Sequence, residues 1–474
     1  MTEQTRAPSR QIAALGLPML VGALSASLAG VVDTAMMGRF GAPELASVAA
    51  SSAVFDIFSG IVLASVTGHQ IMAARFAGRE DPAGILRSLR TTAWFSGGIA
   101  VVLTFGCLFA GGWLTGLVAG GDPQLREIGA DYLAARAPTL LLLAAFVMMT
   151  AIFNAYKKPK YGMWAGIVIN ALNILLDYLL IYGPGPFPRL GAAGNGLATT
   201  LSWAVGVGCL LVATRHFGLL QLLRTPASRI PIDFVTSIPK LGWPAIVSTG
   251  LDYLSVAIFF AIIGGLGAIS LAGGRIAFEV MIFLFGVASA FAAAARILIG
   301  RAVGAQQVGE AKVFWRKGQL TLLVPAAILT AFIAVFPSLV ARVFTGFPET
   351  VDAAADALLL VALALPLMAW TLGNVSVLRA LGHTNLDMYA NLAAALLIQL
   401  PVSWLLAEVG GLGLGGAFLG VLGYWLVRAA ITELLSRRSM QALVPQNLER
   451  TDSQNGRLSH RDTADSGQGA GNRR

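Results

Sequence analysis

The sequence from Ile12 to Phe40 reads IAALGLPMLVGALSASLAGVVDTAMMGRF, an almost unbroken apolar run that contains one aspartate, Asp33. A helix of this length spans the roughly 30 Å hydrocarbon core of a bilayer. A carboxylate inside such a helix costs about 2.5–3.5 kcal/mol on insertion scales, and its usual role is to face a cavity that serves transport. A second aspartate, Asp177, lies in another apolar run. This pattern predicts a membrane transporter.

The composition is typical of a protein that is solvated by lipid. Of the 474 residues, 56% are hydrophobic and 12% are charged. Soluble domains carry about 25% charged residues, so too few are present here to cover a globular surface. The two cysteines, Cys107 and Cys209, both lie in apolar runs, and they predict neither a disulfide framework nor a metal site. The sequence contains no Walker, HExxH or nucleophile-elbow motif.

Apolar runs of about 20 or more residues predict twelve membrane-spanning helices. The predicted spans are 12–38, 44–72, 91–118, 130–155, 161–183, 192–214, 237–264, 269–298, 317–342, 352–379, 386–407 and 411–436. The fold class is therefore an all-α membrane protein. The polar tail from Ser439 onward is rich in Arg, Asp, Ser, Gln and Gly, and we expect it to be disordered.

The distribution of positive charge tests this count independently. If the N-terminus is cytoplasmic, most of the 33 Lys and Arg residues fall on the cytoplasmic side, as the positive-inside rule requires. If one helix had been counted wrongly, the positive charges of the second half would fall on the outer side, so the pattern supports a count of twelve. We therefore expect a multi-pass protein of the cell (inner) membrane with both termini in the cytoplasm. The net charge of +9 then indicates contact with an anionic lipid leaflet, and not with nucleic acid.

The chain repeats itself at an offset of 226 residues. Leu15–Pro18 recurs as Leu241–Pro244, and Arg75–Gly78 recurs as Arg301–Gly304. Each half has an even number of helices, so both halves enter the membrane from the same side, and the substrate path is expected between them. The predicted domains are an N-terminal lobe (1–215), a cytoplasmic connector (216–236), a C-terminal lobe (237–438) and the tail (439–474).

Polar residues gather at one depth in the outer half of the first lobe. Asp33, Asp177 and Thr199 each lie about 9–12 Å below the outer ends of their helices. Two desolvated carboxylates that are close together cannot both stay ionised cheaply. We therefore expect an ion-coupling site for a proton or, with the same oxygens as metal ligands, for sodium. The predicted members of this site are Asp33, Asp177, Asn173 and Thr199. The alternative is that Asn173 and Asp177 only hold helices together.

Other polar residues are candidates for lining a substrate cavity. Asn170 shares a helix face with Asn173 and Asp177. Asp252 lies midway along the seventh span, and Asp56 lies midway along the second, where it could line the path or pair with a donor elsewhere. Arg275 and Glu279 are i, i+4 partners that could simply neutralise each other. The predicted cavity residues are Asp252, Asn170, Arg275, Glu279 and Asp56.

These motifs resemble the multidrug and toxic compound extrusion (MATE) family over about residues 10–436. The matching residues are Pro18, Val32-Asp33-Thr34-x2-Met37-Gly38-Arg39, Asn173-x3-Asp177-x3-Ile181-x-Gly183 and Ala198-Thr199. The resemblance implies a two-lobed antiporter that exports organic cations in exchange for protons or sodium. It also implies that the first-lobe cluster is the cation site.

The second lobe refines the resemblance. Asp252 matches an acidic position of the family eight residues after a proline, and Arg275 stands where the family often has glutamine. One branch also has an aspartate eleven residues before an arginine of the tenth helix, where this chain has Met368. The resemblance is therefore to the DinF-like branch, in which the first lobe is implied to couple.

We therefore expect a secondary active efflux antiporter, and not an enzyme, that works by rocker-type alternating access. Its expected partners are the bilayer and a small, cationic or amphipathic compound; it is expected to be a monomer and to need no cofactor beyond H⁺ or Na⁺. Two alternatives stay open. A flippase of lipid-linked saccharides would keep the fold and change the cargo. A membrane-embedded enzyme would need catalytic groups in long interfacial loops, and the outer loops here are short.

Overall fold

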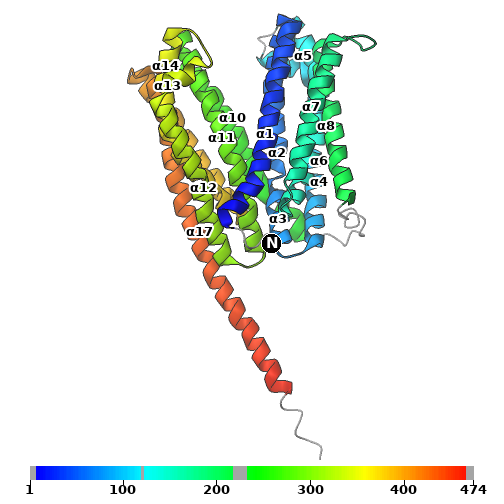
Figure 1. The fold of residues 1–474 in the computed structure, drawn as a ribbon, viewed down its shortest axis with the longest axis vertical. Helices are drawn as coiled ribbons and strands as arrows, with labels where there is room; N and C mark the ends of the chain where they lie inside the picture. The colour runs from blue at the N-terminus through cyan, green and yellow to red at the C-terminus, as the bar shows by residue number, and fades with distance from the viewer. Residues whose placement is uncertain (1–6, 119–121, 217–231, 466–474) are drawn as a thin grey trace, which may run out of the picture.

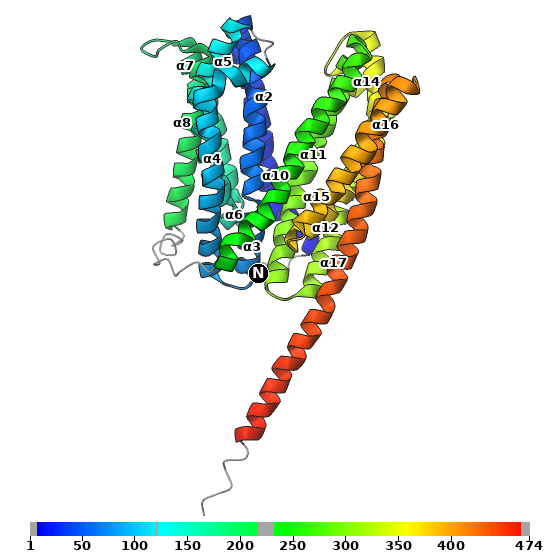
Figure 2. The ribbon, with the colours of Figure 1, turned by 180° about the vertical axis from the view of Figure 1, so that it is seen from behind.

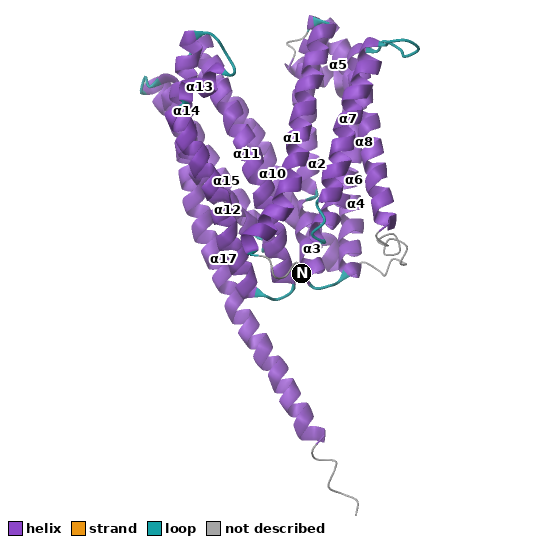
Figure 3. Cartoon of the chain, in the orientation of Figure 1, coloured by secondary structure: helices purple, strands orange, loops and turns teal. Residues whose placement is uncertain are grey.

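The computed structural model describes residues 7–118, 122–216 and 232–465, with 42, 118, 216, 232–235, 268 and 444–465 as backbone alone. All regular structure in these residues is helical (Figure 3). Twelve of the helical segments are long and apolar enough to cross a membrane. They correspond in order to the twelve predicted spans, which confirms the all-α membrane fold.

The first lobe contains the first six spans. Two of them are broken into two helices each, one at Val66 and the other at Ala137 and Pro138, where proline supplies no backbone N–H to continue the ladder. The helices are α1 (Pro8–Phe40), α2 (Ala42–Ser65), α3 (Thr67–Gly78), α4 (Pro82–Val118), α5 (Pro123–Arg136), α6 (Thr139–Ala155), α7 (Lys160–Tyr182) and α8 (Gly191–His216).

The second lobe contains the other six. The ninth span ends at Val335 and not at residue 342 as predicted, because Pro337 begins a separate short helix. The eleventh includes two π-helical segments. The elements are α10 (Ile232–Gly265), α11 (Ala268–Gly304), α12 (Val308–Val335), α13 (Pro337–Arg342), α14 (Pro348–Ala380), α15 (Thr384–Ala393), η2 (Ala394–Gln399), α16 (Leu400–Trp404), η3 (Leu405–Val409) and α17 (Gly413–Asp465).

The C-terminal helix extends beyond residue 439, at which the polar tail is predicted to begin. Helix α17 continues to Asp465, and its first tail residues are packed against the second lobe. Met440 is buried in an apolar cluster with Phe314, and the Ser439 hydroxyl lies 2.9 Å from Nδ1 of His383. These contacts hold α17 against the second lobe beyond residue 438, where this lobe is predicted to end. Residues 466–474, and 217–231 of the predicted connector, lie outside the described residues.

Figures 1 and 2 show two helical bundles that meet where α1 begins and diverge toward the end where α1 finishes. We call these two ends of the molecule the closed end and the open end. Each bundle has its own apolar core, around Tyr132 and Leu140 in the first lobe and around Phe259 and Phe418 in the second. The division into two lobes thus has a physical basis in two separate cores.

The closed end forms where the two repeats meet. Gly78 of α3 lies against the backbone of Arg301 in α11, and Gly304 of α11 lies against the backbone of Arg75 in α3. A Cβ atom at either glycine would overlap the opposing carbonyl oxygen. The two helices can therefore cross this closely only because both positions lack a side chain.

Two arginines cross between the lobes at the same level. Nε of Arg75 donates to the backbone oxygen of Ala380 at 2.8 Å, and Arg301 donates to the backbone oxygen of Ala155. Each guanidinium thus satisfies a carbonyl in the last turn of a helix of the other lobe. Because both donors and both acceptors correspond through the repeat, these contacts have approximate twofold symmetry. We refer to the two arginines, the two glycines and their partners as the closure.

Candidate ion and substrate site

Helices α1, α7 and α8 bring Asp33 and Asp177 together in the open half of the first lobe. Asn195 of α8 lies between them: its Nδ2 donates to Oδ1 of Asp33 and lies 3.4 Å from Oδ1 of Asp177. The two carboxyl groups are also close enough to interact electrostatically. Asp177 and Asn195 are 1% and 0% exposed, whereas Asp33 is partly exposed. The pair therefore forms one buried site that Asp33 connects to the surroundings.

The other two predicted members lie about one turn nearer the closed end. Nδ2 of Asn173 lies 3.4 Å from Oγ1 of Thr199, and the Thr199 hydroxyl donates to the backbone oxygen of Asn195 at 3.1 Å. The structure thus brings all four predicted residues together and adds Asn195, which sequence reasoning missed. Asn195 could have been predicted from its position four residues before Thr199, because this spacing puts both residues on one face of α8.

Two acceptor oxygens of this site, Oδ2 of Asp177 and Oδ1 of Asn195, are buried without a hydrogen-bond partner among the described residues. Leaving buried polar atoms unpaired is costly unless another group satisfies them. Carboxylate, amide and hydroxyl oxygens are ligands that hard cations prefer. The donor set therefore suits a proton or a monovalent cation.

Arg136 of α5 is a positive charge beside the pair that the sequence analysis did not assign. Its guanidinium lies 4.4 Å from the ring centroid of Phe55 and donates to the hydroxyl of Tyr132. It interacts electrostatically with Asp33 and Asp56. Asp56, whose partner the sequence left open, is exposed and belongs to the same electrostatic neighbourhood as Asp33.

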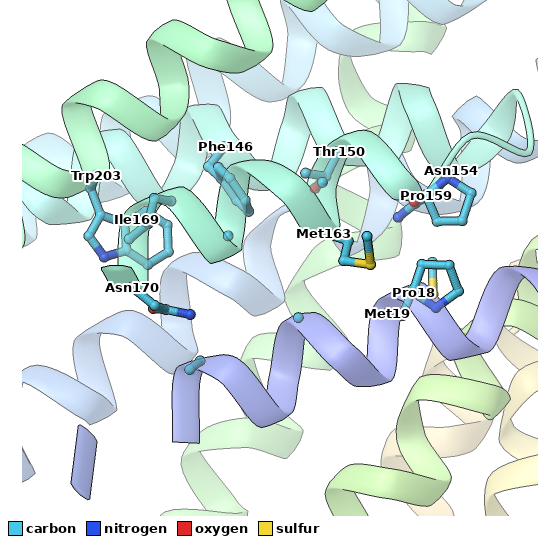
Figure 4. Close-up of a pocket in the computed structure, with 14 residues that line it drawn as sticks. Pro18, Met19, Phe146, Thr150, Asn154, Pro159, Met163, Ile169, Asn170 and Trp203 are labelled. Carbon is cyan, nitrogen blue, oxygen red and sulfur yellow. The ribbon is translucent and has the colours of Figure 1, made fainter. Parts of the chain in front are cut away.

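A cavity of about 260 Å³ lies between α1 and helices α6 to α8 (Figure 4). Its lining is mainly apolar, with side chains such as Met163 and Trp203. Asn170, one of its polar residues, donates to Oγ of Ser25 at 2.9 Å and so links α7 to α1. Asp177 lies seven residues farther along the same face of α7, about 10 Å away. The cavity and the carboxylate pair therefore share one helix face.

Asp252 lies apart from this cavity, in the second lobe. It is exposed, and its Oδ1 accepts a hydrogen bond from Nδ2 of Asn391 at 2.8 Å. The adjacent Tyr253 donates its hydroxyl to the backbone oxygen of Asp56 at 2.9 Å, which places this part of α10 against the first lobe. Met368, at the position of the missing tenth-helix carboxylate, is buried in the second-lobe core.

The remaining predicted cavity residues, Arg275 and Glu279, form an ion pair with a separation of 2.6 Å. Arg275 is exposed and Glu279 is partly exposed. Arg275 also lies over the ring of Phe260, 5.4 Å from its centroid. Neither residue lines the 260 Å³ cavity. The geometry matches the alternative in which the two charges neutralise each other.

Comparisons with known proteins agree with the fold and with the repeat. The chain is 27% identical over 428 residues to a "probable multidrug resistance protein NorM" of Geobacillus kaustophilus, covering 87% of this chain and 91% of that protein. It is similar to a crystal structure of MATE in the bent conformation, with a TM-score of 0.84 and 20% identity over 93% of this chain and 97% of that one.

A second similar structure is an outward-facing multidrug resistance MATE transporter of the MOP superfamily, with a TM-score of 0.82 and 21% identity over 92% of this chain and 97% of that one. The MatE family profile matches residues 18–179 and again residues 244–405. The two matches are separated by the 226-residue offset of the internal repeat, and together they cover more than half of the sequence. The chain therefore belongs to the MatE family of multidrug and toxic compound extrusion proteins, and it is a membrane transporter and not an enzyme.

Proposed function

We propose that this protein exports small organic compounds in exchange for protons, and that Asp33 and Asp177 bind the proton. The observation that carries the proposal is the amide of Asn195, whose Nδ2 donates to Asp33 and lies 3.4 Å from Oδ1 of Asp177, so that it bridges the two carboxyl groups. Two carboxylates that are both this close to one amide repel each other unless one of them is protonated. A proton on either carboxyl group removes this repulsion.

Positive charge supports an orientation for the proposed cycle. The closed end carries Arg75, Arg301 and the other basic residues of the adjoining loops. The positive-inside rule therefore favours a cytoplasmic closed end, with both termini in the cytoplasm and the protein in the inner membrane. The open end then faces outward. In this state the carboxylate pair is ready to take up an external proton while the compound leaves.

Helix α1 supplies a route from protonation to release. Pro18 lies inside α1 and removes one hydrogen bond of the helical ladder, which allows the helix to bend there. Pro18 and Gly22 line the cavity, whereas Asp33 lies about four turns farther along the same helix. A change in how Asp33 contacts α7 would therefore move one wall of the cavity. Related MATE structures have been described in a bent and in a straight conformation.

The cavity supports a small cargo. Its volume of about 260 Å³ is slightly below the usual range for small-molecule sites, and its apolar lining with a few polar groups is typical of them. Both features favour an amphipathic compound over a lipid-linked saccharide. One chain contains both lobes and the whole path between them, so we infer that the monomer is the transporting unit.

Dye transport in liposomes tests the proposal. Purified protein is reconstituted, ethidium is the probe, and proton and sodium gradients are imposed separately. We expect the proton gradient alone to drive transport. If only the sodium gradient drives transport, the coupling ion is sodium and not a proton, bound by the same oxygens. If neither gradient affects transport, the protein does not exchange ions for the compound.

A further inference from the structure

A second polar network, which the proposed proton site does not use, begins at Asp252. Its Oδ1 accepts from Nδ2 of Asn391 at 2.8 Å. Oδ1 of Asn391 accepts from the Tyr424 hydroxyl at 2.7 Å, and this hydroxyl in turn accepts from Arg428. Asn391, Tyr424 and Arg428 are all buried. An exposed carboxylate is therefore joined to a series of buried groups behind it.

The series continues to the closed end. Arg428 donates to Oδ1 of Asp387 at 3.2 Å, and Nε of Arg379 donates to Oδ2 of the same carboxylate at 2.8 Å. Arg379 directly precedes Ala380, whose backbone oxygen accepts the hydrogen bond from Arg75 of the first lobe. A series of hydrogen-bonded side chains thus runs from Asp252 to Arg379, and the peptide bond from Arg379 to Ala380 joins it to the closure. We call this series the second-lobe relay.

From Arg428 to Asp252, each group in the relay donates its hydrogen bond to the next group nearer Asp252. Arginine can only donate, so the Tyr424 hydroxyl accepts from Arg428 and gives its own proton to Asn391. This fixes the Asn391 amide with its nitrogen toward Asp252. Hydrogen bonds in such a series polarise one another, and the bond to the carboxylate is strongest when the carboxylate is charged. Neutralising Asp252 therefore weakens the whole series.

We propose that the second-lobe relay locks the empty transporter, and that binding of the positively charged group of an exported compound at Asp252 releases the closure. An exchanger has to stay in one state while it is empty, so a link between an exposed carboxylate and the closure serves the transport cycle. Asn391, Tyr424, Arg428 and Asp387 are positioning residues in this scheme. Nε of Arg428 is buried without a hydrogen-bond partner among the described residues. The guanidinium therefore does not use all of its donors in the relay.

This inference rests on export of a cationic compound but not on proton coupling at Asp33 and Asp177. Its test measures the closure directly. Spin labels are placed at Ala83→Cys and Glu310→Cys, exposed positions in the first turns of α4 and α12, in a protein whose Cys107 and Cys209 are replaced by alanine. Pulsed electron paramagnetic resonance then reports the populations with short and long distances across the closed end.

The substitution Asp252→Asn removes the negative charge at this position, as the bound positive group of a compound would neutralise it. We expect it to raise the ratio of long to short distances by about tenfold, the effect of losing one charge-assisted hydrogen bond. In a Tyr424→Phe background, which keeps the ring and removes the relay hydroxyl, Asp252→Asn should add little, because the link is already broken. Tyr389→Phe, at an exposed tyrosine on α15, is the matched control, and in it Asp252→Asn should keep its full effect.

The inference is overturned if Asp252→Asn leaves the distances unchanged, or if it has the same effect with and without the Tyr424 hydroxyl. Equal loss of the effect in the Tyr389→Phe control would also overturn it. Asn391→Leu removes the hydrogen bond between Asn391 and Asp252 and serves as a second background. In it too, Asp252→Asn should add little. A failure of proton exchange in the dye assay leaves these distances unaffected, so the two proposals can fail separately.

Discussion

At the scale of single residues, the proposed proton site depends on Asn195 as much as on the two aspartates. Its amide contacts both carboxyl groups. Replacing it by alanine removes a buried hydrogen bond to a charged group, which is worth about 1.5–3 kcal/mol. We expect Asn195→Ala to slow proton-driven ethidium transport by about tenfold or more.

A control on the same helix separates this effect from general damage to α8. Ser202 is also buried, and its hydroxyl donates to the backbone oxygen of Ala198 one turn away. Ser202→Ala should therefore transport nearly as well as the unmodified protein. Unchanged transport by Asn195→Ala would remove Asn195 from the proposed site.

His383, in the turn between α14 and α15, makes stability depend on pH. Partial burial, and then the positive charge of Arg75, lower its pKa from the ordinary value of 6.5. As the pH falls below about 6.5, the unfolded chain takes up a proton on this residue before the folded chain does, so folding loses stability. We expect the thermal midpoint to fall more between about pH 7.5 and pH 5.5 in the unmodified protein than in His383→Gln. An equal fall in both proteins would contradict this.

At the scale of elements, the crossing of α3 and α11 depends on the absence of side chains. A methyl group at Gly304 would overlap the backbone of Arg75, so Gly304→Ala should destabilise the protein by about 1–3 kcal/mol through overpacking. At Gly309, in the first turn of α12, a methyl group would meet only open space among the described residues. Gly309→Ala should therefore be neutral or stabilise by up to about 1 kcal/mol. Equal thermal midpoints for the two variants would contradict the close crossing.

The spans were predictable because helix length and apolar composition are enough to define them. Their interruptions were harder to predict. Pro337 is a visible signal for the early end of α12, but the break at Val66 has no proline or glycine at that residue. The helical start of the tail depends on contacts of Ser439 and Met440 with distant residues, which composition alone does not record.

At the scale of the whole molecule, the approximate twofold symmetry of the closure predicts that its two arginines contribute similarly. Arg75 and Arg301 each bond to a carbonyl oxygen of the opposite lobe. We expect Arg75→Gln and Arg301→Gln each to raise the ratio of long to short distances across the closed end by about threefold to tenfold. A large effect from one arginine and none from the other would contradict a shared role.

The repeat and the depth of the aspartates were predictable from residue offsets and helix rise. The groups that meet between helices were not. Asn195, Arg136 and the partners of Asp252 lie on different helices, and their contacts depend on how each helix is rotated and tilted. The apolar pattern of a membrane helix carries little of this information, because lipid and helix packing both favour apolar side chains.

The central claim is that Asp33 and Asp177 exchange a proton for the exported compound. The most direct measurement is proton movement when an ethidium gradient alone is imposed across proteoliposomes, followed with a pH-sensitive dye. We predict proton movement opposite to the dye in the unmodified protein and in Asp131→Asn, a control at an exposed residue of α5. We predict none in Asp33→Asn or Asp177→Asn, although both should remain in the membrane. Normal proton movement in both of these variants would contradict the account.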